Sequence, residues 1–279
     1  MNSRSALRRN RDGLARIRFP ALTPQRRWGD GACPYQDLPG ESGFALRRDP
    51  DRFARYDRRV GILVTDFDGT ITETDIYMLI RARYMDPALP EYFDEYRRGR
   101  MTHFEAMAHY LSHGPTTLHE WEILMRDAEP DPGLRDAVGR LQSAGWTIVI
   151  ASAGGLWYID RMLATAHVNG VVVHANPGAF AEGVGLRLQM PAASPFVSES
   201  VGVNKEAVVR DAMLKDDVVA FAGDGPPDVP AALLVKPELR FARGWLAAHL
   251  RERGEPFVAF RRWSEIVPVL QNFGPAKIT

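Results

Sequence analysis

Three apolar runs of strand length stand out in the pattern of hydrophobic and polar positions. They cover Val60 to Val64, Thr147 to Ile150 and Val218 to Ala222. Continuous apolar runs of this length, without polar alternation, are typical of strands that are buried on both faces of a parallel sheet. Each run is followed within a few residues by glycine and by an aspartate or a serine. The pattern therefore predicts buried parallel strands that end in residues able to do chemistry.

Helical periodicity fills the chain between and after these runs. Leu156, Ile159, Leu163 and Ala166 form an apolar stripe, so we expect a helix that begins near Leu156. A strand and a hairpin are predicted within Val171 to Pro191, where turn residues recur. Four more helices are predicted between the first two runs, over Asp75 to Arg83, Glu91 to Arg98, His103 to His113 and Leu118 to Asp127.

Two aspartates follow the first apolar run directly. Asp66 and Asp68 are separated by one residue, so both can face the same side of an extended chain. Gly69 allows a sharp turn, and Thr70 offers a hydroxyl beside it. Such a carboxylate pair suits a nucleophile, an acid/base partner and a divalent cation. The alternative is an acidic Asp-Gly turn that only closes a strand.

Polar residues also accompany the other two runs. Ser152 and Ala153 precede two glycines. A Ser-x-Gly-Gly segment between a strand and a helix can direct backbone N–H groups and a hydroxyl at a phosphate. Asp224 lies between glycines after the third run, and Asp228 follows it. Lys205 opens a predicted helix just before that run. Taken alone, Ser152 would be an ordinary loop serine and Lys205 a surface charge.

The motifs occur in the order Asp-x-Asp-Gly-Thr, Ser-x-Gly-Gly, Lys and Gly-Asp-Gly-x-x-Asp. This order resembles the haloacid dehalogenase-like (HAD) hydrolase superfamily, from roughly Arg59 to Leu270. The resemblance implies an α/β fold, a Rossmann-like doubly wound parallel sheet with an inserted helical cap domain. It assigns residues 58–75 and 129–272 to the catalytic core and residues 76–128 to the cap.

The resemblance also implies a reaction, the hydrolysis of a small-metabolite phosphate monoester through an aspartyl-phosphate. Asp66 would be the nucleophile, and Asp68 the general acid and then the general base. The phosphate would be bound by Thr70, Ser152, Ala153 and Lys205. Mg²⁺ would be the cofactor, with Asp66, the backbone carbonyl of Asp68 and Asp224 as its ligands and Asp228 supporting them from behind.

Two other functions stay open at this point. One is a phosphotransferase or mutase of the same superfamily, which passes the phosphoryl group to an alcohol. The other is a catalytically silent binding protein that keeps the fold. The dehalogenases themselves lack an acid at the position of Asp68, because their leaving group needs no proton, so phosphoryl chemistry is favoured here.

Within the superfamily, the helical cap and the Ser-Ala-Gly-Gly and Gly-Asp-Gly-x-x-Asp segments resemble the phosphoserine phosphatase-like branch. Thr70 to Asp75 and the tail from Arg240 to Ile266 look closer to the enol-phosphate phosphatases of methionine salvage. Two departures count against phosphoserine as the substrate. Pro227 stands where the phosphoserine enzymes carry an asparagine, and the segment Phe104 to Leu111 lacks the arginine that would bind the substrate carboxylate. Arg97, Arg98 and Arg100 could replace that arginine, although such a charge run is usually a solvated face.

Composition narrows the choice of partners. Lys+Arg and Asp+Glu number 35 each, so no global field favours nucleic acid or an acidic membrane. No apolar run approaches the roughly 20 residues needed to span a bilayer, and a single cysteine, Cys33, fits a reducing cytoplasm. Residues 1–57 are an Arg-rich extension that we expect to be disordered, with no role assigned.

Overall fold

One parallel sheet organises the part of the chain that the computed structural model describes, residues 61–273. Its six strands lie in the order β10-β9-β8-β1-β2-β3, and every neighbouring pair is parallel. The predicted parallel sheet is confirmed, whereas the predictions for residues 1–57 lie outside the described range. The strands are β1 (Gly61–Thr65), β2 (Trp146–Gly155), β3 (Val172–Asn176), β8 (Val219–Gly223), β9 (Arg240–Ala242) and β10 (Val258–Ala259).

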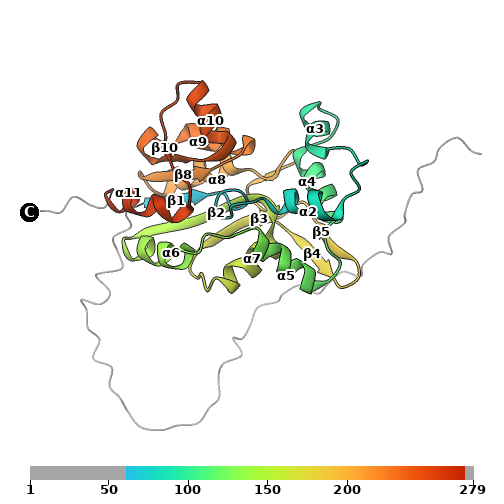
Figure 1. Ribbon diagram of the computed structural model, residues 1–279. Coiled ribbons are helices and arrows are strands. Elements are labelled where there is room, and N and C mark those ends of the chain that lie inside the picture. Colours follow the sequence, from blue (N-terminus) through green and yellow to red (C-terminus); the bar gives the residue numbers. More distant parts are fainter. Residues whose placement is uncertain (1–60, 274–279) are drawn as a thin grey trace, which may run out of the picture. The chain divides into compact units, whose positions relative to one another are not determined.

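Helices cover both faces of this sheet (Figure 1). Leu63 and Ile148 belong to a core with the helices of one face, while Val64 and Phe221 belong to a second core with the helices of the other. Because alternate strand residues point to opposite faces, both sets must be apolar, which explains the unbroken runs. The first face has α6 (Leu134–Ser143) and α7 (Leu156–Thr165), and the second has α8 (Lys205–Lys215), α9 (Val229–Leu234) and α10 (Gly244–Glu252).

The strand order changes direction at β1. After β1 the chain adds β2 and β3 on one side, and later adds β8, β9 and β10 on the other. The carboxyl ends of β1 and β8 therefore flank the point where the winding direction changes. In open α/β sheets, ligands bind at this point.

The second strand is longer than its sequence indicates. The apolar run ends at Ile150, but β2 continues through Ser152 to Gly155. A register shift between Ala151 and Gly155 lets the strand pair again with β3, at Asn176. The Ser-x-Gly-Gly segment is therefore irregular extended backbone at the end of a strand.

Four helices follow β1, as predicted, and the last of them packs on α7, which covers one face of the sheet. Thr102 caps the third helix in a capping box with Glu105. In the fourth helix, the fully buried Trp121 contacts the rings of Trp157 and Tyr158 in α7. The boundary between core and cap stays a prediction. The four helices are α2 (Ile76–Tyr84), α3 (Tyr92–Arg97), α4 (His103–Ser112) and α5 (Leu118–Asp127).

Two small hairpins join this helical segment to the core. The predicted hairpin is confirmed as β4 (Gly178–Ala181) and β5 (Gly185–Leu188), which are antiparallel. Its turn reaches the loop between α4 and α5, where the Gly183 N–H donates to the Thr116 carbonyl at 2.8 Å. The second hairpin, β6 (Val197–Ser198) and β7 (Gly202–Val203), follows it. Between its strands, the Ser200 carbonyl accepts from the Phe104 N–H of α4 at 2.9 Å.

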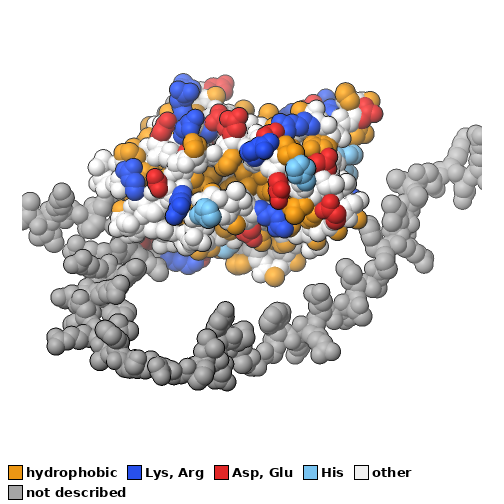
Figure 2. All heavy atoms as spheres, turned by 60° about the horizontal axis from the view of Figure 1, so that its bottom comes forward, with side chains coloured by type: hydrophobic (Ala, Val, Ile, Leu, Met, Phe, Trp, Pro, Cys, Tyr) orange, Lys and Arg blue, Asp and Glu red, His pale blue; other side chains and the backbone are white. Residues whose placement is uncertain are grey.

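The surface carries charges of both signs. On the face shown in Figure 2, basic and acidic side chains are interspersed around a central hydrophobic area. Among residues 61–273, no helix is long and apolar enough to cross a membrane. A cytoplasmic location stays a prediction.

Candidate active site

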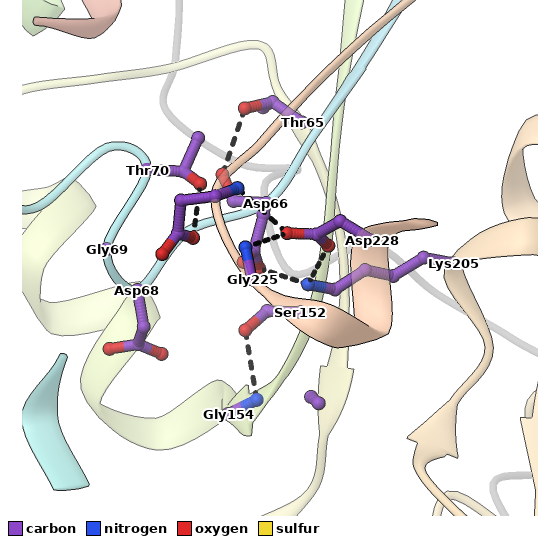
Figure 3. Close-up of polar contacts among 12 residues, drawn as sticks. Thr65, Asp66, Asp68, Gly69, Thr70, Ser152, Gly154, Lys205, Gly225 and Asp228 are labelled. Atoms are coloured by element: carbon purple, nitrogen blue, oxygen red, sulfur yellow. Dashed lines mark hydrogen bonds and ion pairs between the residues drawn. The ribbon is translucent and has the colours of Figure 1, made fainter. Parts of the chain in front are cut away.

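The first aspartate continues the sheet, and the second lies just past it (Figure 3). The Asp66 N–H donates to the Ala222 carbonyl of β8 at 2.9 Å, so Asp66 is fixed beside the end of that strand. Both Asp66 and Asp68 are buried. The chain then turns at Gly69, which has φ +71°, and a Cβ there would lie 2.5 Å from Asp224 Oδ2. Only glycine fits this turn, because any side chain would displace the Asp224 carboxylate.

Lys205 is buried between two aspartates. Its Nζ lies 2.8 Å from Asp66 Oδ1 and 2.5 Å from Asp228 Oδ1, and only 4% of the side chain is exposed. Asn204 caps the helix by accepting from the Ala207 N–H, so Lys205 begins α8 as predicted. Burial would lower the pKa of Lys205, but the charges of Asp228 and Asp66 outweigh it and raise that pKa. The lysine is therefore a fixed cation of the site.

The loop after β8 is held by its last aspartate. Asp228 Oδ2 accepts from the N–H groups of Asp224 and Gly225, each at 2.9 Å, while its Oδ1 faces Lys205. The Thr70 hydroxyl donates to Asp224 Oδ1 at 2.8 Å. Thr70 was predicted to bind phosphate. In this structure its hydroxyl holds Asp224, and a phosphate contact stays a prediction.

Three carboxylates converge at the end of β1 and β8. Oxygen atoms of Asp66, Asp224 and Asp228 all lie within 4.8 Å of one another. Burial raises the pKa of Asp224 to about 8, and the charges of Asp75 and Asp228 add to this effect. Such crowding opposes ionisation of all three carboxyl groups at once, and a cation bound between them would relieve it. A cluster of carboxylate oxygens fits Mg²⁺, which prefers hard oxygen ligands.

A tyrosine that the sequence did not single out holds Asp68. The Tyr158 hydroxyl donates to Asp68 Oδ2 at 2.5 Å, and the Ile76 N–H donates to Oδ1 at 3.4 Å. Burial raises the pKa of Asp68 to about 6, although the hydrogen bond from Tyr158 opposes the shift. Gly154 leaves room for this contact, because a Cβ there would lie 2.0 Å from the Tyr158 hydroxyl. The sequence feature that could have indicated this contact is a tyrosine four residues after Gly154.

The predicted phosphate-binding segment of β2 lies at the same edge of the sheet. Ser152 is buried, and its Oγ accepts from the Gly154 N–H at 2.9 Å (Figure 3). The Ala153 carbonyl accepts from the Asn176 side chain at 2.8 Å. Ala153 and Lys205 line one cavity, so the structure brings both of them together. Phosphate binding by Ser152 and Ala153 stays a prediction.

Asp75 adds another carboxylate to the site. It precedes α2 and does not cap that helix with its side chain. Burial raises the pKa of Asp75 to about 8, and the charges of Asp68 and Asp66 contribute next. Asp75 was not among the predicted site residues, although it stands in sequence close to the first motif.

A cavity of about 240 Å³ opens beside Lys205. Tyr96 of α3 lines it from the helical segment, and Val201 and Pro227 line it from the core. Lys205 and Glu206 are the charged residues in the lining, and Glu206 Oε1 pairs with Arg210 at 2.7 Å. The cavity is therefore lined largely by uncharged groups.

The three arginines after Tyr96 have partners on their own segment. Arg97 pairs with Asp94, and Arg98 and Arg100 pair with Glu95. Each arginine side chain is more than half exposed. They form a solvated face in this structure, and none of them lines the cavity.

Comparison with known proteins agrees with this geometry. A model of the haloacid dehalogenase-like hydrolase family matches residues 63–233. Similar sequences include the 2-hydroxy-3-keto-5-methylthiopentenyl-1-phosphate phosphatases of Bacillus velezensis and Geobacillus kaustophilus, each 24% identical. The first alignment covers 77% of this chain and 92% of the relative, and the second covers 76% and 96%.

Solved structures with a similar fold include a substrate-bound phosphoserine phosphatase and a HAD family hydrolase of Salmonella enterica. The phosphoserine phosphatase superposes with a TM-score of 0.55 at 13% identity, over 76% of this chain and 99% of that one. The Salmonella protein gives a TM-score of 0.57 at 14% identity, over 79% and 72%. The predicted fold class is thereby confirmed, and with it the resemblance seen in the motifs. The chain therefore belongs to the haloacid dehalogenase-like hydrolase family, as a phosphatase of that family.

Proposed function

We propose that this protein is a Mg²⁺-dependent phosphatase that hydrolyses a small-metabolite phosphate monoester through an aspartyl-phosphate. The observation that carries the proposal is the placement of Lys205 between Asp66 and Asp228, with Asp68 held nearby by Tyr158. One aspartate is thus paired with a fixed cation, and the other is hydrogen-bonded to a neutral hydroxyl. Carboxylates in such different environments suit different roles.

The first step forms the covalent intermediate. Lys205 binds Asp66 Oδ1, which leaves Oδ2 of the same carboxylate available for attack on phosphorus. As the new O–P bond forms, the bond from phosphorus to the leaving oxygen breaks, and Asp68 gives that oxygen its proton. The raised pKa of Asp68, about 6, supports this role, because a carboxyl group with an ordinary pKa would rarely be protonated near neutral pH.

The second step returns the enzyme to its starting state. Asp68, now a carboxylate, accepts a proton from water while the water oxygen attacks phosphorus. The bond between phosphorus and the Asp66 oxygen breaks, inorganic phosphate leaves, and Asp66 is again a carboxylate. Asp68 acts first as an acid and then as a base, so its fixed position beside Tyr158 serves both steps.

Charge on the phosphoryl group must be balanced throughout. Asp66 and Asp224 are the side chains we assign to Mg²⁺, because Asp228 is fully buried and its two oxygens already make three contacts, one with Lys205 and two with backbone N–H groups. When bound, Mg²⁺ would offset the negative charge of the phosphoryl oxygens and of the carboxylates. Lys205 contributes its own positive charge at the same place.

The relatives and the cavity suggest the class of substrate. The similar sequences are named for an enol phosphate that carries a methylthio group. Tyr96, Val201 and Pro227 in the cavity lining suit such a partly apolar leaving group. We therefore infer that the cavity holds the leaving group. The substrate is then a small phosphorylated metabolite whose body, apart from the phosphate, is uncharged.

Phosphate release from a panel of metabolite phosphates, with and without EDTA, tests the proposal. The Asp66→Asn variant should lose all but about a thousandth of the activity, because a missing nucleophile costs several orders of magnitude. Asp211→Asn is the matched control, since Asp211 is partly exposed on α8 and its ion pair is with Lys215. An Asp66→Asn variant that keeps more than about a hundredth of the wild-type rate would exclude the covalent mechanism. Transfer of the phosphoryl group to added glycerol instead of water would identify a phosphotransferase.

A further inference from the structure

A turn near the end of the described chain is hydrogen-bonded to the residue that precedes Asp66. The indole N–H of Trp263, the first residue of the 3₁₀ helix η3 (Trp263–Ile266), donates to the Thr65 hydroxyl at 2.9 Å. The two residues lie 198 positions apart in the sequence, and both are fully buried. A buried indole N–H needs an acceptor, and here the acceptor is the side chain at the end of β1.

The Thr65 hydroxyl continues this contact to Asp66. It donates to the Asp66 backbone carbonyl at 2.9 Å (Figure 3). Thr65 is the last residue of β1 that pairs with β2, so Asp66 lies beyond that ladder. A hydroxyl has one hydrogen and two lone pairs. Because the indole N–H occupies a lone pair, it limits the rotation of the hydroxyl and keeps the hydrogen directed at the Asp66 carbonyl.

The backbone of Asp66 is therefore held on both sides of its Cα. Its N–H donates to the Ala222 carbonyl at 2.9 Å, and its carbonyl accepts from Thr65. Lys205 Nζ lies 2.8 Å from Oδ1 of the carboxylate. With these three contacts in place, the direction of the remaining oxygen, Oδ2, is determined by the backbone and the lysine together.

The same turn also holds the far end of the loop that follows β1. The Ser264 N–H donates to Asp131 Oδ2 at 2.7 Å, and the Asp131 N–H donates to the Ile71 carbonyl at 2.9 Å. Asp131 is buried. Two adjacent residues of η3 thus bind the loop, Trp263 at its start and Ser264 at its end, and between these points lie both aspartates of the first motif.

We propose that Trp263 is a positioning residue for catalysis, whose indole N–H, acting through Thr65, fixes the backbone of Asp66 so that the carboxylate is aimed at phosphorus. The inference rests on the proposed function and goes beyond it, because it makes the nucleophile depend on a residue outside the motifs. Trp263 is fully buried, so it acts through Thr65 and not on the substrate. In-line attack tolerates little displacement of the nucleophile, so loss of the bond should slow the chemical step more than it weakens binding.

The test compares variants of the full-length chain. Trp263→Phe keeps an aromatic ring and removes the indole N–H, and Thr65→Val removes the hydroxyl at nearly unchanged volume. Thr65→Ser keeps the hydroxyl. Trp146→Phe is the matched control, because Trp146 is also buried and donates its indole N–H, to the Leu270 carbonyl at 3.2 Å. Trp146 pairs with Gly61, at the end of β1 away from the site.

Kinetics are measured on the best ester of a panel, at a temperature at which melting curves show every variant folded. We expect Trp263→Phe and Thr65→Val each to lower kcat about tenfold, a part of the roughly hundredfold that a misplacement of about 1 Å can cost. KM should stay within about twofold in both, because neither residue binds the substrate. Thr65→Ser and Trp146→Phe should keep kcat within about twofold of wild type. The double variant should be about as slow as Thr65→Val alone, because both changes break one chain of hydrogen bonds.

Two results would overturn the inference. One is a kcat of Trp263→Phe that falls no further than that of Trp146→Phe. The other is a Thr65→Ser variant as slow as Thr65→Val, since the hydroxyl would then not matter, and this pair decides the question if Trp263→Phe does not fold. A wild-type protein that releases phosphate from no ester, or an active Asp66→Asn variant, would instead refute the proposed function, so the two failures can be told apart.

Discussion

The Tyr158 hydroxyl donates to Asp68 Oδ2 at 2.5 Å, and both side chains are buried. The bond joins α7 to the loop after β1, and so fixes the carboxyl group that we assign as acid and base. Its geometry depends on Gly154, whose missing side chain leaves space for the hydroxyl. Three parts of the chain that are far apart in sequence thus determine the position of one carboxyl group.

Removal of this hydroxyl should slow turnover. Tyr158→Phe keeps the ring in its contact with Trp121 and removes only the hydrogen bond to Asp68. A hydrogen bond to a charged group contributes about 1.5–3 kcal/mol, so we expect kcat to fall about tenfold or more. Steady-state kinetics on the best ester of a panel measures this. Tyr84→Phe, which removes the same atom at the end of α2, should leave kcat unchanged, and an equal kcat in both variants would mean that Tyr158 does not position Asp68.

Metal removal should abolish activity. We expect no phosphate release in excess EDTA, full recovery with Mg²⁺ and poor recovery with Ca²⁺, whose looser coordination suits in-line geometry less well. Asp224→Ala should raise the Mg²⁺ concentration needed for half-maximal rate at least about tenfold, because it removes a proposed ligand. Titration of the rate with Mg²⁺ measures both effects. Undiminished turnover in EDTA would refute the metal assignment.

Asp228 should matter more for stability than for metal affinity. It is fully buried, and it is one of two carboxylates that neutralise the buried Lys205. Breaking a buried ion pair costs about 3–5 kcal/mol, so we expect Asp228→Asn to lower the free energy of unfolding by about 3 kcal/mol, with Asp66 still beside the lysine. Urea unfolding without metal measures this. Asp211→Asn breaks the exposed pair with Lys215 and should leave the urea midpoint unchanged. Equal midpoints in the two variants would contradict this account.

Trp121 should be needed for the fold of the core. It belongs to α5, inside the predicted cap, yet it is fully buried and its ring contacts Trp157 and Tyr158. We expect Trp121→Ala to cost about 3–5 kcal/mol, which thermal or urea unfolding would measure. Leu118→Ala, a truncation of a 37% exposed residue on the same helix, is the control and should cost far less. Excision of residues 90–127 would expose the same rings, so it should destabilise the core as well as change specificity.

The sequence predicted what depends on local pattern. Apolar runs located β1, β2 and β8, because a strand covered on both faces must be apolar at every position. The motif order then placed Asp66, Lys205 and Asp224 at one edge of a parallel sheet, where the structure has them. Single residues at strand ends were sufficient to predict that these side chains lie together, because the carboxyl ends of adjacent parallel strands lie at the same edge of the sheet.

Contacts between segments that are distant in sequence could not be predicted from local patterns. Nothing in the spacing around Thr70 indicated that its hydroxyl would hold Asp224, since that contact depends on the turn at Gly69 and on the end of β8. Tyr158 was missed for a related reason. A buried tyrosine looks like an ordinary core residue in sequence, and only the folded structure shows that its hydroxyl donates to Asp68.

Phosphoserine should be a poor substrate. It presents an ammonium and a carboxylate, and burial of either charge without a partner costs several kcal/mol. Among the described residues that line the cavity, Lys205 is the one cation that could pair with a carboxylate, and it is already held by Asp66 and Asp228. The nearby arginines are exposed and bound to acidic residues of their own segment, Arg97 to Asp94, and Arg98 and Arg100 to Glu95.

We therefore expect kcat/KM for phosphoserine to lie at least about tenfold below that of the best ester in the panel, since the loss of one good charged contact is enough for that difference. Single Arg→Ala variants at 97, 98 and 100 make the measurement decisive. If phosphoserine ranks first and one of these variants loses that preference, the arginine must leave its acidic partner and turn into the cavity. The neutral leaving group would then be the wrong assignment, and the helical segment would recognise its substrate by charge.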